Sequence, residues 1–87
     1  MFYVYIIKSL FKTWCYVGQT VNINQRLIRH SSGREKTTKY YRPFELIFVQ
    51  ECIDRLEARN LEKYLKIRSN KESLLLLIAG VAKLVDA

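Results

Sequence analysis

The sequence predicts an α+β fold, with one small domain whose strands and helices follow the order ββαβαα. Two runs of β-branched and aromatic residues, 2–7 and 14–17, are separated by a polar turn, which is typical of a hairpin. A third alternating run, 44–50, follows the only proline. Helix-start signals come after the second and third runs. The length of 87 residues corresponds to one domain with a modest core.

The two strands of the hairpin bring several tyrosines together. Alternation places Tyr3 and Tyr5 on one face of the first strand. If the partner strand turns Tyr16 to the same face, phenol hydroxyls converge on one patch. Gly18 is expected to end the second strand at a turn. For any single tyrosine here, the alternative is a ring that fills the sheet surface and keeps its hydroxyl in water.

After the hairpin, the pattern predicts a helix over residues 23–31. Thr20 or Asn22 can cap its first turn, because both side chains accept a hydrogen bond from a backbone amide. Arg26 and His30 are four residues apart, so a guanidinium and an imidazole are expected to share an exposed edge. The apolar stripe of this helix consists of Ile23, Leu27 and Ile28.

The second half of the chain predicts a strand followed by two helices. Run 44–50 is almost continuously apolar, which predicts burial on both of its faces. Asp54 followed by Glu57 has the spacing of a helix start, and the apolar stripe continues to about residue 68. The same spacing recurs at Ser69 and predicts a third, shorter helix.

Charge favours a polyanionic partner. Fifteen Lys and Arg residues against eight acids give a net charge of +7 and a pI near 9.7, which places nucleic acid first among the partners. Solvated helix faces are the alternative explanation, because the cations are spread along the chain. The basic loop 34–42 contains Tyr40 and Tyr41 and is expected to be mobile or to face a ligand.

The cysteines and the apolar runs indicate a cytoplasmic protein without membrane association. Cys15 and Cys52 have no metal-binding spacing and lie in apolar runs, so we expect reduced, packed thiols. The longest apolar run, 74–82, is far shorter than the roughly 20 residues that cross a bilayer.

Five short elements follow one another along the chain. They are Tyr3-Val4-Tyr5, Tyr16-Val17-Gly18, Arg26-Leu27-Ile28-Arg29-His30, Arg42-Pro43 and Glu57-Ala58-Arg59-Asn60-Leu61-Glu62-Lys63. In this order the sequence resembles the GIY-YIG nucleases, above all small stand-alone members similar to the amino-terminal domain of the DNA-repair excinuclease. Tyr3 stands where the family has its first glycine. The resemblance implies a GIY-YIG-like fold, in which a small three-stranded antiparallel sheet is flanked by helices.

The resemblance also implies an active site that hydrolyses DNA phosphodiester bonds. It gives the catalytic residues as Tyr5, Tyr16, Arg26 and His30, the metal ligand as Glu62, and the second motif's glycine as Gly18. The reaction needs an activated water, a cation on the phosphate and help for the leaving oxygen. By this resemblance, Glu62 would hold Mg²⁺ or Mn²⁺, and Arg26 would grip the scissile phosphate.

Each of these roles has an alternative. Tyr5 is favoured as the base with Tyr16 as its hydrogen-bonding partner, but the sequence does not separate the two. Either phenol needs cations nearby to lower its pKa, such as Arg26, Lys12 or the metal. His30 is expected to contact phosphate or share proton transfer, and a solvated histidine is the alternative. For Glu62, the alternative is a structural pair with a base, either Arg59 or Lys66.

The predicted partner is DNA, bound with little sequence preference. The expected nucleic-acid-binding residues are Arg29, Lys36, Lys39 and Arg42. We expect a monomer or weak dimer, with a larger protein as a possible source of targeting. Two alternatives are a DNA-binding domain of the same fold without cleavage and an RNA- or ribosome-associated accessory protein.

Two parts of the chain are distinguished. Residues 1–73 are expected to form the nuclease-like domain. Residues 74–87 are expected to form an apolar tail, either a short helix or a read-through end outside the family pattern.

Overall fold

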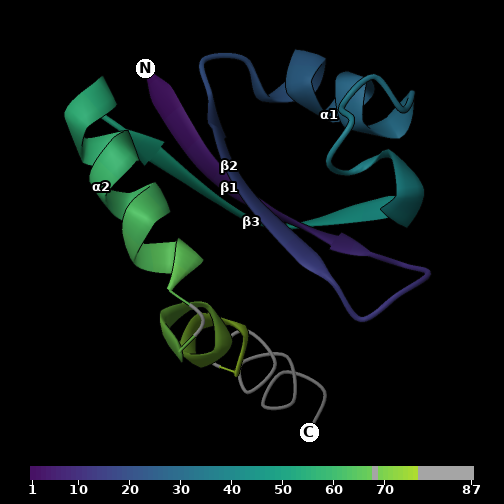
Figure 1. The fold of residues 1–87 in the computed structure, drawn as a ribbon. Coiled ribbons are helices and arrows are strands. Elements are labelled where there is room, and N and C mark those ends of the chain that lie inside the picture. The colour runs from purple at the N-terminus through teal and green to yellow at the C-terminus, as the bar shows by residue number, and fades with distance from the viewer. Residues whose placement is uncertain (68, 77–87) are drawn as a thin grey trace, which may run out of the picture.

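The computed structural model describes residues 1–67 and 69–76 (Figure 1). Its elements are the strands β1 (Phe2–Ser9), β2 (Cys15–Thr20) and β3 (Phe44–Cys52), the helices α1 (Ile23–Ser31) and α2 (Arg55–Lys66), and the 3₁₀ turn η1 (Lys39–Tyr41). Residues 69–76 are also helical. The predicted α+β fold with the order ββαβαα is confirmed, and α1 has its predicted bounds.

The first strand is the centre of the sheet. The strand order is β2-β1-β3, and both pairings are antiparallel. Residues 4–7 of β1 are all buried, because this strand has a neighbour on each side and a helix over each face. The side chains of β1 therefore define two separate layers of packing.

One face of the sheet carries the apolar core. Val4 and Ile6 of β1 pack there against Ala58 and Leu65 of α2. Helix α1 lies on the opposite side of the sheet in Figure 1. Each buried Val, Ile or Leu side chain stabilises the fold by about 1.5–3 kcal/mol, so this layer supplies much of the stability. The opposite face carries Ile7 together with polar and aromatic groups.

Two predictions about burial are wrong. Strand β3 was expected to be buried on both faces, but it is an edge strand whose Leu46 and Val49 are 38% and 42% exposed. The apolar stripe of α1 was expected to include Ile28, which is 64% exposed. Both errors have one cause, because hydrophobicity along a segment does not show how many neighbours the segment acquires.

Polar side chains fix the ends of the elements. Asn22 Oδ1 accepts a hydrogen bond from the Gln25 amide at 3.0 Å, and Asp54 Oδ1 accepts one from the Glu57 amide at 2.8 Å. These contacts satisfy amides that have no partner within the first helical turn. Of the two predicted caps for α1, Asn22 is therefore the one used, and the helix start at Asp54 is confirmed.

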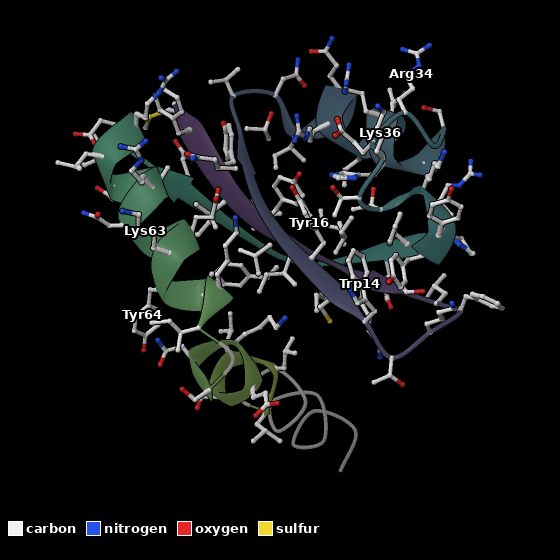
Figure 2. All side chains as sticks on the ribbon, in the orientation of Figure 1. Trp14, Tyr16, Arg34, Lys36, Lys63 and Tyr64 are labelled. Atoms are coloured by element: carbon white, nitrogen blue, oxygen red, sulfur yellow. The ribbon has the colours of Figure 1, made fainter. Side chains whose placement is uncertain are left out.

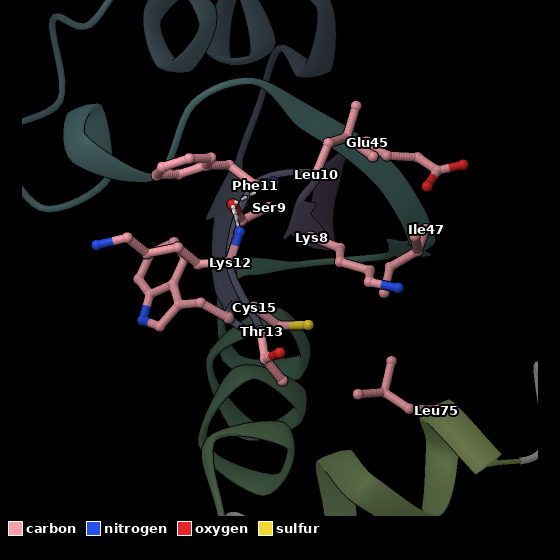
Figure 3. Close-up of a pocket in the computed structure, with 11 residues that line it drawn as sticks. Lys8, Ser9, Leu10, Phe11, Lys12, Thr13, Cys15, Glu45, Ile47 and Leu75 are labelled. Carbon is pink, nitrogen blue, oxygen red and sulfur yellow. Dashed lines mark hydrogen bonds between the residues drawn. The ribbon is translucent and has the colours of Figure 1, made fainter.

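Ser9 organises the turn between β1 and β2 (Figure 3). Its Oγ accepts hydrogen bonds from the amides of Phe11 and Lys12 at 3.1 and 2.9 Å. The same hydroxyl donates to the carbonyl of Tyr41 at 2.7 Å. A pocket of about 590 Å³ lies beside this turn, with Leu75 on its far side. Ser9 thus ties the hairpin to the loop that precedes β3.

The end of the described chain is helical. Leu74, where the tail was expected to begin, packs against the core. The remainder of the expected tail, 77–87, lies outside the described residues. Within the described ranges, no helix combines the length and apolarity that a bilayer crossing requires.

Candidate active site

Two phenols meet on the face of the sheet that α2 does not cover. The β1–β2 register pairs Ile7 with Tyr16 and Tyr5 with Gly18, so both tyrosines project to the same side. Their ring centroids are 6.3 Å apart. Tyr5 is fully buried and Tyr16 is half-buried; Figure 2 shows Tyr16 over the middle of the sheet. The predicted convergence of tyrosines is therefore confirmed.

Gly18 allows these two rings to lie against the sheet. A Cβ atom at this position would be 2.6 Å from the Tyr5 hydroxyl oxygen and 2.8 Å from Cε2 of Tyr16. Gly18 was expected to end β2 at a turn, and this is wrong because it lies inside the strand, opposite Tyr5. The glycine is needed for space above the strand rather than for an unusual backbone angle.

His30 joins Tyr5 to the loop beyond α1. The Tyr5 hydroxyl and His30 Nε2 are 2.8 Å apart, and His30 Nδ1 and the Thr38 hydroxyl are also 2.8 Å apart. His30 was expected on an exposed edge of the helix, but it is only 1% exposed because its ring packs against those of Tyr5, Tyr16 and Phe44. Burial lowers the pKa of His30, and the nearby charge of Arg26 lowers it further. The imidazole is therefore neutral at physiological pH.

Arg26 completes the cluster. Its Nε donates to the Tyr5 hydroxyl at 3.3 Å. An arginine has only donors, so the Tyr5 oxygen accepts this bond and its own proton can go to His30 Nε2. Burial opposes the charge of Arg26, but hydrogen bonding to Tyr5 and the surrounding charges outweigh this effect and raise its pKa. Interaction with the Tyr16 hydroxyl also raises the pKa of Arg26. We call Tyr5, Tyr16, Arg26 and His30 the phenol–arginine cluster.

Glu35 borders this cluster and was missed in the sequence analysis. Its carboxylate lies 2.8 Å from Arg29 Nε and 3.6 Å from Arg26 Nη1. The hydrogen bond from Arg29 lowers the pKa of Glu35, and the charge of Arg26 contributes in the same direction. Glu35 is the one acid in the basic segment 34–42, which was the available signal. Thr38 was also missed, because nothing local in the sequence shows that this threonine becomes buried.

The pKa of Tyr5 does not move in the expected direction. Burial raises it to about 12, although the hydrogen bond and charge of Arg26 oppose the change. Lys12, another expected neighbour, instead places its ammonium group 5.5 Å from the centre of the Tyr41 ring. Tyr5 therefore keeps its proton far above physiological pH in this arrangement.

Glu62 lies on α2, which packs against the other face of the sheet. Its carboxylate is 2.9 Å from the Lys66 ammonium, and its side chain is 17% exposed. The structural pair with Lys66 that the sequence left open is thus present. Within the described residues, no hydrogen bond or ion pair joins Glu62 to the phenol–arginine cluster, and no group of three or more Asp, Glu, His or Cys residues could hold a metal.

The expected nucleic-acid-binding residues differ in whether their charged groups contact other groups of the protein. Arg29 is paired with Glu35, and Arg42 donates to the carbonyls of Lys39 and Ser31 at 3.0 and 3.4 Å. The ammonium of Lys39 lies 4.9 Å from the centre of the Tyr40 ring. Lys36 is exposed beside α1, as Figure 2 shows.

Aromatic rings extend from the cluster to the hairpin. Trp14 stacks on Tyr41 with ring centroids 3.9 Å apart and planes 9° from parallel. The ring centroids of Tyr16 and Phe44 lie 6.2 and 6.3 Å from that of Trp14. The half-buried Tyr41 shows that loop 34–42, expected to be mobile or ligand-facing, is partly packed against the hairpin.

Comparison with known proteins agrees with this arrangement. Residues 1–74 match the sequence profile of the GIY-YIG catalytic domain. A UPF0213 protein of Syntrophus aciditrophicus is 41% identical, with 86% of this chain and 87% of that protein aligned. A UPF0213 protein of Pediococcus acidilactici is 35% identical over 84% of this chain and 76% of its own length. These names state no activity.

A solved structure supports the same relationship. The solution NMR structure of a UPF0213 protein from Bacillus halodurans aligns with this protein at a TM-score of 0.56 and 34% sequence identity. The alignment covers 88% of this chain and 85% of the Bacillus halodurans chain. The matched range, residues 1–74, spans the phenol–arginine cluster and Glu62. The protein belongs to the GIY-YIG family, whose domain is typical of nucleases.

Proposed function

We propose that this protein is a metal-dependent endonuclease that hydrolyses phosphodiester bonds in DNA. The observation that carries the proposal is the position of Arg26, whose Nε donates to the Tyr5 hydroxyl beside a neutral, buried histidine. A polyanionic substrate fits the net charge of +7. Membership of the GIY-YIG family supports a nuclease, and the roles of individual residues are our inference.

Arg26 would bind the phosphate that is attacked. A guanidinium offers two parallel N–H donors to a phosphate, and its charge stabilises the negative charge that grows on the oxygens during displacement. Nε of Arg26 is used by Tyr5, and Nη1 lies near Glu35. Phosphate would therefore compete with Glu35 for the terminal nitrogens, while Tyr5 keeps the guanidinium oriented.

Tyr16 is the better candidate for the base. The attacking water must reach the phenol oxygen, and Tyr16 is half-buried whereas Tyr5 has no exposed surface. The raised pKa of Tyr5 also opposes its ionisation. We therefore assign Tyr16 to the water and Tyr5 to the orientation of Arg26 and His30, which reverses the preference drawn from sequence. As water attacks phosphorus, its proton would pass to the phenolate form of Tyr16, the bond between phosphorus and the leaving oxygen would break, and the leaving oxygen would take up a proton from water.

Glu62 would hold the metal. Magnesium binds hard oxygen ligands and often uses one or two carboxylates, with waters and substrate phosphates completing its shell. A single half-buried carboxylate fits that requirement once Lys66 is displaced. A bound Mg²⁺ or Mn²⁺ would supply charge to the phosphate and the leaving oxygen. Arg59, one turn before Glu62 on α2, lines a pocket together with Arg26, which supports a location of Glu62 beside the cluster.

Cleavage of supercoiled plasmid with Mg²⁺ or Mn²⁺ tests the proposal. We expect nicking by the unmodified protein and a loss of several orders of magnitude in Tyr16→Phe and Glu62→Ala. Glu57→Ala is the matched control, because it removes an exposed acid from the same helix. DNA affinity of Glu62→Ala should hold or rise, since a negative charge has been removed. Undiminished cleavage by Glu62→Ala would contradict the metal assignment.

A non-cleaving nucleic-acid-binding domain is the second candidate. One observation favours it, namely the pairing of Glu62 with Lys66. In that case, plasmid would remain supercoiled with either metal, while a gel shift would show binding. The same gel shift with single-stranded RNA would separate a DNA-binding role from an RNA-associated one.

A further inference from the structure

Three arginines from two helices line one pocket at the end of β2. Arg26 comes from α1 on one face of the sheet, and Arg55 and Arg59 come from α2 on the other. The pocket has a volume of about 370 Å³. Its remaining lining residues are Phe2, Gln19, Thr20 and Val21. We call it the three-arginine pocket; it wraps around the free edge of the sheet, because β2 has no partner on its outer side.

The two arginines of α2 are not neutralised. Within the described part of the chain, neither Arg55 nor Arg59 forms an ion pair. The guanidinium of Arg55 lies 5.7 Å from the centre of the Phe2 ring, a contact that positions the group and leaves its donors free. The residues are four apart, so both lie on the same face of the helix.

The neighbouring acids are engaged elsewhere. The Asp54 carboxylate accepts the Glu57 amide at the start of α2, and Glu62 is paired with Lys66. Glu35 is shared between Arg29 at 2.8 Å and Arg26 at 3.6 Å, so it offsets only part of the charge of the three arginines. Like charges that converge without an equal number of acids repel one another, and an anion in the pocket would remove that repulsion. Arginine is well suited to bind phosphate, because the N–H donors of its planar guanidinium match two phosphate oxygens.

We propose that Arg55 and Arg59 bind a backbone phosphate of the nucleic acid next to the one held by Arg26. The identity of the ligand rests on the proposed function, whereas the convergence of cations does not. Because the pocket spans the edge of β2, the bound strand passes from the cluster face of the sheet to the face covered by α2. Neither arginine belongs to the phenol–arginine cluster, so their contribution is to binding and to substrate orientation.

The test compares two double variants of equal charge. Arg55→Gln/Arg59→Gln empties the pocket of two cations. Lys8→Gln/Lys71→Gln removes two cations elsewhere, since Lys8 lies at the hairpin end of β1, as Figure 3 shows, and Lys71 lies in the helical segment 69–76. Both variants lower the net charge of +7 by two. Affinity for a short DNA duplex would be measured without divalent metal, so that no cleavage occurs, between about 50 and 200 mM salt.

Loss of one phosphate contact lowers the slope of log affinity against log salt by about 0.9. We expect that reduction, with affinity several-fold weaker at the lower salt, in Arg55→Gln/Arg59→Gln and a smaller change in the lysine variant. Arg55→Lys/Arg59→Lys should restore most of the slope, because it keeps the charges. Equal slopes for the two glutamine variants would overturn the proposal.

Two further results separate this inference from the proposed function. If the unmodified protein binds DNA through the pocket and plasmid remains uncut, the endonuclease proposal fails and the pocket stands. If plasmid is cut and the arginine variant binds like the lysine variant, the pocket proposal fails alone. Inorganic phosphate that shifts the Nε–H resonances of Arg55 and Arg59, without any effect of the arginine variant on DNA binding, would show a free-phosphate site and would also overturn it.

Discussion

The hydroxyl of Tyr5 lies 2.8 Å from Nε2 of His30, a side chain that is 25 residues away in the sequence. This bond joins the central strand to the last turn of α1, and Thr38 extends it into the following loop. Arg26 donates to the same phenol oxygen. A buried chain of polar groups therefore connects the sheet, the helix and the loop, and its protonation state is coupled to folding.

Alkaline pH should destabilise the fold through Tyr5. An unfolded tyrosine ionises near pH 10, whereas the pKa in the fold is about 12. Above pH 10 the folded state binds more protons than the unfolded state, so the free energy of unfolding falls as pH rises toward 12. The loss reaches about 2–3 kcal/mol. Urea unfolding at pH 9 and pH 11.5 measures it, and Tyr5→Phe should show a clearly smaller drop. The same drop in both proteins would exclude Tyr5 as its source.

Mild acid should destabilise the fold through His30. The folded state disfavours the imidazolium, because burial and the charge of Arg26 lower its pKa. The unfolded state takes up a proton near pH 6.5, so the free energy of unfolding decreases as pH falls below that value. The chain has one histidine, so a change in the free energy of unfolding between pH 7.5 and 5 can be assigned to His30. In His30→Gln, the free energy of unfolding measured by urea titration should depend less on pH. A steep decrease that persists in this variant would refute the assignment.

Thr38→Val should cost about 1–3 kcal/mol of stability. The substitution preserves shape but leaves Nδ1 of His30 without its buried partner. Thr37→Val is the matched control, because Thr37 is exposed and adjacent. Thermal unfolding of the two variants gives the comparison. Similar midpoints for both would show that water replaces the Thr38 hydroxyl at no cost.

Gly18→Ala should destabilise the protein by about 1–3 kcal/mol, because the added methyl group must displace the rings of Tyr5 and Tyr16. Gln19→Ala, on the same strand, is expected to have less effect. Tyr5→Phe removes the oxygen that the methyl group would meet at 2.6 Å. The double variant Tyr5→Phe/Gly18→Ala should therefore be more stable than the sum of the single changes predicts. Strict additivity would contradict this close contact.

Local sequence patterns predicted the elements well. The alternation around Tyr5 and the polar turn indicated the hairpin, and cap spacing indicated helix starts at Asn22 and Asp54. These signals work because strand alternation and end-capping depend on neighbouring residues only. Gly18 shows the limit of local patterns. The sequence predicted a turn that ends the strand, whereas the glycine lies within the strand beneath the rings of Tyr5 and Tyr16.

Sequence patterns alone were sufficient for the α+β class and the α1 bounds, because periodicity and capping are properties of short segments. The register of the hairpin was required to bring Tyr16 to the same face as Tyr5. Tertiary packing was required to bury His30, to place Glu35 beside Arg26, and to bring Arg55 and Arg59 into a pocket with Arg26. Burial and pKa depend on which segments pack together, and those contacts join residues far apart in the chain.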